Sequence, residues 1–273
     1  VGEDVSMTTP PEGYVRSADG TTIAFESTGA GPALILIEAA AHYRAFSSFT
    51  GLTQLLSDRF TVYRYDRRGR GDSTDTLPYS VDREVEDIAA LVDQAGGSAY
   101  VYGFSSGALL GLHAAAAGVA IPRLALLEPP LDDDETQAPS SLTTELEELT
   151  MAGRNSDAVE HFQISIGVPD EIIEDSRGTP AWKAMESVAH TLVYDCRISE
   201  ATEPEVFAAA TAPTLVLNSD GSTDDLSGWA SQVAARLPNA THRSLAGEWH
   251  GLADDVLAPV LIEFFTASAD ETP

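Results

Sequence analysis

Short apolar runs alternate with helix-forming segments along most of this chain, and this alternation restricts its fold more than any other feature. The runs Ala33–Ile37 and Leu124–Leu127 are apolar throughout, which is typical of strands covered on both faces. The segment Val81–Ala95 has the periodicity of an amphipathic helix and ends at two glycines. This alternation predicts an α/β chain with a mostly parallel, doubly wound sheet. Further strands are expected at Tyr14–Arg16, Thr22–Glu26, Phe60–Tyr65, Ala99–Tyr102, Pro213–Leu217 and Thr241–Leu245, and further helices at Phe49–Leu56, Leu226–Leu237 and Val256–Phe265.

The strand pattern stops between residues 131 and 210. Helix-favouring acidic stretches such as Ser141–Met151 and Pro180–Val193 occupy this part of the chain. A stretch of about eighty residues between two strands has to lie outside the sheet. We therefore expect an inserted helical lid at 131–210, a core domain formed by 14–130 and 211–273, and an N-terminal tail at 1–13.

The charge of the chain argues against several classes of partner. There are 43 Asp and Glu against 15 Lys and Arg, a formal net charge of −28, and the acids of Val81–Asp93 are expected on the helix exterior. Such a chain repels nucleic-acid phosphates and anionic membrane surfaces, and no run of about 18 apolar residues predicts a membrane span. We expect a cytoplasmic protein that acts on a small molecule, with no nucleic-acid or membrane partner. Its oligomeric state is left open.

Cofactors and metals are not indicated. The one cysteine, Cys196, can form neither an internal disulfide nor a cysteine metal site. The glycine-rich segment Asp66–Ser73 (DRRGRGDS) does not have the spacing of a phosphate-binding loop. Its glycines are expected in a tight turn and its arginines in pairs with nearby carboxylates. We expect no cofactor and no bound metal.

The pattern Gly103-Phe104-Ser105-Ser106-Gly107 fits G-x-S-x-G between an expected strand and an expected helix. A serine on such a sharp turn presents its hydroxyl at the carboxyl end of the sheet, where it can act as a nucleophile. The amides at the start of the following helix can stabilise the charge that develops during the reaction. A glycine-serine turn without chemistry is the alternative interpretation.

A nucleophilic serine needs a base. Among the six histidines, His250 alone follows the last expected strand in a glycine-rich loop that precedes a helix. His113 falls inside the helix after the Ser105 turn, and we interpret it as structural. The other candidates for lining a pocket are His42, His161 and His190.

These segments resemble the α/β-hydrolase superfamily from about Tyr14 to Phe265, and within it small hydrolases of the actinobacterial type. The resemblance rests on the Ser105 turn, the segment Tyr65–Ser73 (YDRRGRGDS), the insertion and His250. It implies the α/β-hydrolase fold with a lid, and a triad of serine, histidine and an acid.

The chain departs from the family at the loop after its first apolar strand. Family members usually carry His-Gly-x there, whereas this chain has Glu38-Ala39-Ala40. The resemblance then implies an oxyanion hole formed by the backbone amides of Ala40 and Ser106. Glu38 is expected to face away from it, because its charge would oppose an oxyanion.

The triad acid is the second departure, because Ser222 stands where the family usually has aspartate. Glu128 is the first candidate, since it directly follows the strand Leu124–Leu127 and some lipases place their acid there. Asp220 is the second candidate, and Asp224 remains open. A carboxylate in any of these places could fix the tautomer of His250.

The sequence thus predicts a serine hydrolase that cleaves an ester, thioester or lactone of a small, largely apolar substrate through an acyl-enzyme on Ser105. The resemblance also allows a C–C bond hydrolase or cyclase with the same residues. A non-catalytic ligand-binding protein on this fold is the alternative from another class.

Overall fold

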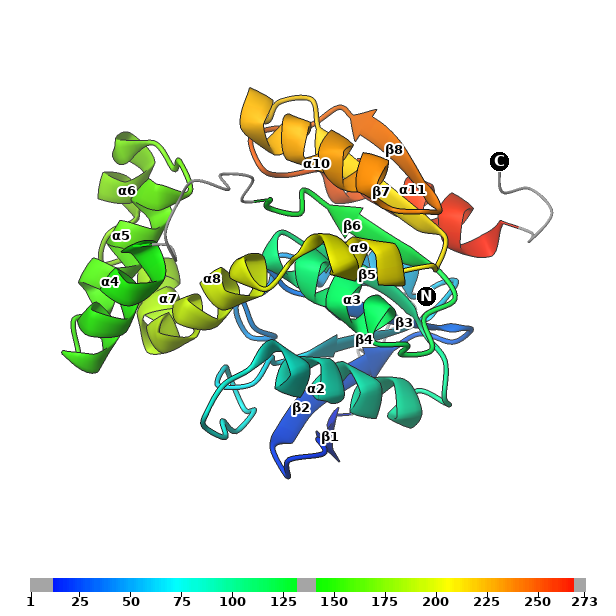
Figure 1. Ribbon diagram of the computed structural model, residues 1–273, viewed down its shortest axis with the longest axis horizontal. Helices are drawn as coiled ribbons and strands as arrows, with labels where there is room; N and C mark the ends of the chain where they lie inside the picture. Colours follow the sequence, from blue (N-terminus) through cyan, green and yellow to red (C-terminus); the bar gives the residue numbers. More distant parts are fainter. Residues whose placement is uncertain (1–11, 132–140, 268–273) are drawn as a thin grey trace, which may run out of the picture.

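The computed structural model describes residues 12–131 and 141–267, and Figure 1 shows its arrangement. In the described chain the strands form one sheet in the order β1-β2-β4-β3-β5-β6-β7-β8. The pairs β1/β2 and β2/β4 are antiparallel and all other neighbours are parallel, which confirms the predicted mostly parallel sheet. The strands are β1 (Glu12–Arg16), β2 (Thr22–Thr28), β3 (Ala33–Ile37), β4 (Thr61–Tyr65), β5 (Tyr100–Phe104), β6 (Leu124–Leu127), β7 (Thr214–Ser219) and β8 (Ala240–Leu245).

Both faces of the sheet are covered, and this explains the continuous apolar runs. In β3, Leu34 and Leu36 point to one face while Ile35 and Ile37 point to the other, and all four are fully buried. Alternate residues of a strand face opposite sides, so a strand with two covered faces must be apolar throughout. Helices α1 (Thr50–Leu56) and α11 (Asp254–Thr266) cover the face of Leu34, and α2 (Val81–Gln94), α3 (Ser106–Ala116), α9 (Pro204–Ala209) and α10 (Asp224–Arg236) cover the face of Ile35.

Helix α2 differs from expectation in where its acids lie. Ser80 caps its N-terminus by accepting a hydrogen bond from the amide of Arg83, as a serine at this position commonly does. Glu84 and Asp87, however, are buried rather than exterior. Both carboxylates pair with buried arginines of the Asp66–Ser73 loop, and a buried charge requires such pairing.

The insertion between β6 and β7 forms a cap with a core of its own. Buried residues of this core include Leu146, Val159, Trp182 and Tyr194, and it is separate from the two cores of the sheet. Figure 1 shows α4 to α7 standing to one side of the sheet and α8 returning towards α3. Helix α9, at the end of the insertion, packs into the sheet core through Phe207. We call the following elements the cap: α4 (Ser141–Met151), α5 (Asn155–Ser165), α6 (Asp170–Ser176), α7 (Pro180–Ser187), the 3-10 turn η1 (Ala189–Thr191) and α8 (Leu192–Glu200).

The parallel strands bring the candidate functional residues to one edge. Ser105 follows β5 and Glu128 follows β6, and these two strands are neighbours in the sheet. The loop of Glu38 to Ala40 follows β3, and the loop that carries His250 follows β8. Because parallel strands end at the same side, this edge is where a ligand site is expected in an open α/β sheet.

Candidate active site

Ser105 occupies a strained turn between β5 and α3. Its backbone has φ of 54° and ψ of −124°, a conformation that residues with a side chain rarely adopt. A Cβ atom on Gly103 would lie 2.3 Å from the carbonyl oxygen of Gly107, so only glycine fits before this turn. Helix α3 begins at Ser106, and amides in a first helical turn have no acceptor within the helix.

The loop after β3 lies against the start of α3. A Cβ atom on Gly107 would be 2.4 Å from the carbonyl oxygen of Ile37 and 2.6 Å from that of Glu38. The second glycine of the G-x-S-x-G pattern is therefore needed for this approach of two backbones. It brings the segments of Ala40 and Ser106, the two expected oxyanion amides, close together.

His250 and Glu128 are joined by a hydrogen bond of 2.6 Å between Nδ1 and Oε2. Because an ionised carboxylate only accepts hydrogen bonds, the proton is assigned to Nδ1, which leaves Nε2 with a free lone pair. The His250 ring also lies 4.8 Å, between centroids, from the ring of Phe104, the residue before Ser105. The histidine therefore lies beside the serine turn in the tautomer that a general base needs.

Glu128 is completely buried and held at both oxygens. Its Oε1 accepts hydrogen bonds from the amide of Ser219 (2.8 Å) and the hydroxyl of Ser222 (2.6 Å). Burial by itself raises the pKa of this carboxyl, but the hydrogen bonds from His250, Ser222 and Ser219 outweigh it and the pKa of Glu128 is lowered. The side chain is therefore held as a carboxylate.

Ser222 connects the two partners a second time. Its hydroxyl donates to Glu128 and accepts a hydrogen bond of 3.0 Å from the backbone amide of His250. Sequence reasoning placed Ser222 at the usual aspartate position but gave it no role. The sequence signal that could have predicted this contact is a glutamate directly after β6 together with a serine, instead of the usual aspartate, after β7.

The other candidate acids lie elsewhere. Asp220 is exposed, and its Oδ1 accepts a hydrogen bond of 3.0 Å from the amide of Gly247. That contact joins the loops after β7 and β8 without involving the His250 ring. The side chain of Asp224 lies outside the described part of the structure.

Backbone strain is concentrated at this edge of the sheet. Across residues 12–131 and 141–267, four non-glycine residues have positive φ: Ala41 (58°), Ser105 (54°), Glu128 (45°) and His250 (51°). Such conformations each cost about 1–3 kcal/mol and tend to cluster at functional sites. Three of the four are the candidate nucleophile, base and acid, and Ala41 follows the candidate oxyanion residue Ala40.

The carboxylate of Glu38 is bound by two serines of the segment that leads to α1. It is buried and accepts hydrogen bonds from the hydroxyls of Ser47 and Ser48, the latter at 2.8 Å. Burial raises the pKa of Glu38, although these hydrogen bonds and nearby His42 act against it. The Glu38 carboxylate is thus directed to the Ser47 and Ser48 side chains.

The remaining histidines do not join His250. His42 lies next to the candidate oxyanion loop, with Nδ1 2.8 Å from the carbonyl oxygen of Ala40 and its ring stacked on Phe46. In the described residues no three His, Cys, Asp or Glu side chains are grouped as metal ligands would be. The other histidine contacts are His113 with Thr202, His161 with Glu145, His190 with Asp75 and His242 with Asn218.

A cavity of about 550 Å³ lies at a different place in the structure. It is lined by the loop around Arg44, by Asp66 and Asp72, and by Val188 of the cap, but by none of Ser105, Glu128 and His250. We therefore place the candidate active site on the hydrogen-bonded side chains rather than in this cavity.

No helix of the described chain is long and apolar enough to cross a membrane.

Comparisons with known proteins agree with this architecture. A family model described as the alpha/beta hydrolase family matches residues 29–259. The chain is 44% identical to an alpha/beta hydrolase from Sphaerobacter thermophilus, with 93% of this chain and 100% of that one covered and a TM-score of 0.85. An enol-lactonase from Burkholderia xenovorans is 20% identical, with 93% and 100% covered and a TM-score of 0.69.

A thermophilic esterase from Thermogutta terrifontis is also 20% identical, over 88% of this chain and 91% of that one, with a TM-score of 0.69. The two more distant likenesses show a shared fold. The family match extends over most of the chain, and the Sphaerobacter structure adds a high identity over nearly its full length. The chain belongs to the alpha/beta hydrolase family.

Proposed function

We propose that this hydrolase cleaves a carboxylic ester, thioester or lactone through an acyl-enzyme on Ser105. The observation that carries the proposal is the hydrogen bond from His250 Nδ1 to the buried carboxylate of Glu128, at the sheet edge where Ser105 is held in a strained turn. A carboxylate that fixes the histidine tautomer next to a serine is the arrangement of a hydrolytic triad. The proposal therefore assigns nucleophile, base and acid to these three residues.

In the proposed reaction, Nε2 of His250 removes the Ser105 proton while Oγ attacks the substrate carbonyl carbon. The amides of Ala40 and Ser106 donate to the resulting oxyanion, and α3 adds its positive N-terminal dipole. His250 then protonates the leaving group, and the acyl group remains on Ser105. Water that loses a proton to His250 attacks the acyl-enzyme, releases the acid and restores the serine.

The charge of the chain supports a preference among substrates. With a net charge of −28, the protein's field opposes the approach of polyanions. We propose a small, neutral or cationic, largely apolar substrate. The likeness to an enol-lactonase and to an esterase makes lactones and simple esters the first compounds to assay.

Labelling with a fluorophosphonate, read by intact mass, tests the nucleophile. The folded wild-type protein should gain one adduct, and Ser105→Ala should gain none. Ser106→Ala is the matched control, because it removes the neighbouring hydroxyl and keeps the nucleophile. A folded wild-type protein that remains unlabelled, or a Ser105→Ala variant that hydrolyses esters at the wild-type rate, would overturn the proposal.

A further inference from the structure

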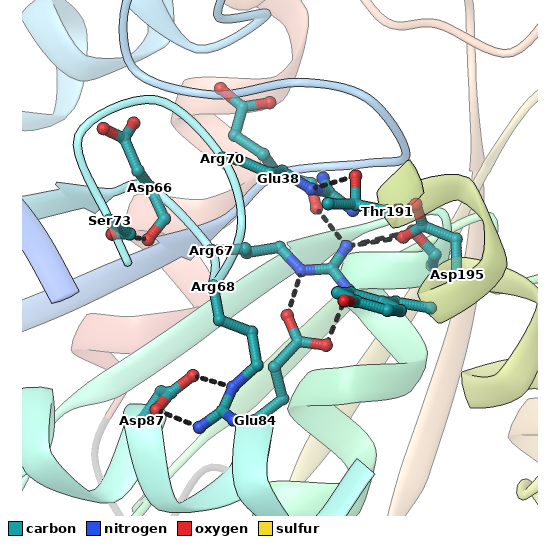
Figure 2. Close-up of polar contacts among 12 residues, drawn as sticks. Glu38, Asp66, Arg67, Arg68, Arg70, Ser73, Glu84, Asp87, Thr191 and Asp195 are labelled. Atoms are coloured by element: carbon teal, nitrogen blue, oxygen red, sulfur yellow. Dashed lines mark hydrogen bonds and ion pairs between the residues drawn. The ribbon is translucent and has the colours of Figure 1, made fainter. Parts of the chain in front are cut away.

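A buried ion cluster joins the cap to the sheet beneath the candidate oxyanion hole. Figure 2 shows Arg67, from the loop after β4, between Glu84 of α2 and Asp195 of cap helix α8. Arg70 of the same loop also pairs with Asp195. Both arginines and both acids are buried. The two positive and two negative charges balance, which is the condition under which a buried cluster is tolerated.

Asp195 binds three partners on the sheet side. Its Oδ1 accepts hydrogen bonds of 2.7 Å from the hydroxyl of Ser106 and 2.7 Å from Nη1 of Arg67. Its Oδ2 accepts a hydrogen bond of 2.7 Å from Nη2 of Arg70. These contacts hold the pKa of Asp195 below its usual value despite burial. A cap carboxylate thus anchors the residue directly after the nucleophile.

Arg70 connects the same cluster to the other half of the hole. Its Nη1 donates to the carbonyl oxygens of Ala39 (2.8 Å) and His42 (3.2 Å), on either side of Ala40. The carbonyl of Ala39 belongs to the same planar peptide unit as the amide of Ala40. A guanidinium bound to that oxygen therefore fixes the plane, and with it the direction of the Ala40 N–H.

We propose that Asp195 is a positioning residue, through which docking of cap helix α8 sets the spacing of the two oxyanion amides. The chain of contacts is continuous, from the Ala39 carbonyl through Arg70 and Asp195 to the hydroxyl of Ser106. The inference rests on the proposed function, because it concerns the amides that would bind the oxyanion. It adds that the hole is complete only when α8 is in place.

The test compares Asp195→Asn with wild type on one good ester substrate, with rates normalised to fluorophosphonate-reactive sites. Asparagine keeps the volume, and its one oxygen can replace Oδ1, which accepts from Ser106 and Arg67. Its NH2 nitrogen then faces Nη2 of Arg70 and cannot accept that hydrogen bond. Removal of one oxyanion donor costs about 10²–10³-fold in kcat, so its misalignment should cost roughly 10- to 100-fold. KM should change less than about two-fold, since the hole acts on the transition state. Affinity for a trifluoromethyl ketone analogue of the substrate should fall by the same factor as kcat/KM.

Asp87→Asn is the matched control for the loss of a buried carboxylate. Asp87 pairs with Arg68 of the same loop through two hydrogen bonds of 2.8 Å, and both side chains are fully buried. Figure 2 shows this pair on the side of the loop away from Asp195. Asp87→Asn should lower Tm as Asp195→Asn does, while kcat per reactive site stays within about two-fold of wild type.

If the wild-type protein is labelled and Asp195→Asn keeps the wild-type kcat, the inference is wrong while the proposed function stands. An equal loss of kcat in Asp87→Asn also overturns it, because the effect would then be general destabilisation. If Asp195→Asn does not fold, Ser106→Ala is the deciding variant. It removes the hydroxyl that donates to Asp195 and accepts from Arg67, and it keeps the backbone amide. A several-fold lower kcat in that variant supports the inference, and an unchanged kcat overturns it. If the folded wild-type protein is not labelled, the proposed function is wrong, and the inference that rests on it is wrong as well.

Discussion

Glu128 and His250 are 122 residues apart in the chain, yet Oε2 and Nδ1 lie 2.6 Å apart. The acid follows β6, the strand beside the one that carries Ser105, and both partners have left-handed backbone conformations. Ser222, on the loop after β7, holds the pair from the side. Ser222, after β7, thus provides a hydroxyl that holds the carboxylate of Glu128, which follows the neighbouring strand β6.

Glu128→Gln should lower kcat by about 10³–10⁴-fold with little change in KM, because an amide cannot stabilise the imidazolium and admits the wrong tautomer. The measurement is steady-state hydrolysis of an ester by variants of verified fold. Asp220→Asn is the matched control, and its kcat should stay within about two-fold of wild type. A larger loss in Asp220→Asn than in Glu128→Gln would contradict this assignment.

Ser222→Ala should lower kcat by roughly ten-fold. The change removes one hydrogen bond to the buried carboxylate of Glu128 and one from the amide of His250, and a hydrogen bond to a charged group contributes about 1.5–3 kcal/mol. The remaining contact from the Ser219 amide keeps Glu128 in place. Steady-state kinetics and a crystal structure of the variant would check this. Wild-type kcat would show that Ser222 is dispensable, whereas activity as low as that of Glu128→Gln would mean the acid has moved.

Gly107→Ala should destabilise the fold by about 1–3 kcal/mol or more and lower activity, because the added methyl meets backbone oxygens that cannot move aside easily. Those oxygens belong to Ile37 and Glu38, at 2.4 and 2.6 Å from the position that the methyl carbon would take. Gly228→Ala, in α10 with open space around it, should instead stabilise by about 0.5–1 kcal/mol. Urea unfolding of both variants measures the contrast, and equal midpoints would contradict it.

Glu38→Gln should become relatively more stable as the pH rises. Burial raises the pKa of Glu38 in the folded state, whereas the unfolded value is about 4.3. Between these two values the folded state binds more protons, so the free energy of unfolding of the wild type falls with increasing pH. Glutamine has no such dependence. Urea unfolding midpoints should be measured for both proteins at pH 4 and pH 7.5. The midpoint of the variant minus that of the wild type should increase with pH, and a decrease would refute the argument.

The sheet could be predicted from the sequence because its strands are covered on both faces. Runs such as Ala33–Ile37 have no polar position, and the structure gives the same bounds for β3. The strand-to-helix turn at Ser105 was equally predictable, because such a sharp turn demands glycines at fixed offsets. The close approaches at Gly103 and Gly107 explain both glycines.

The contact between Glu128 and His250 and the buried ion cluster were harder to predict, because they depend on side chains from distant elements. Glu128 could be proposed but not separated from Asp220, since the choice depends on which loop reaches the His250 ring. Asp195 lies in the insertion, where nothing in the sequence distinguishes it from the other acidic residues. Its burial follows from a tertiary contact between α8 and the loop after β4, and local periodicity carries no information about that contact.

The anchoring of α8 also limits how this protein can be recombined with its relatives. A chimera whose exchanged insertion has no acid at the position of Asp195 would leave Arg67 and Arg70 with Glu84 as the one remaining acid of the buried cluster. A crossover before η1, near residue 188, would keep α8 with Arg67 and Arg70, but it would divide the cap core, because Tyr194 of α8 packs with Val159 and Trp182 of the outer helices. Library designs that vary substrate range should therefore exchange the insertion as a whole and keep an aspartate at the position of Asp195.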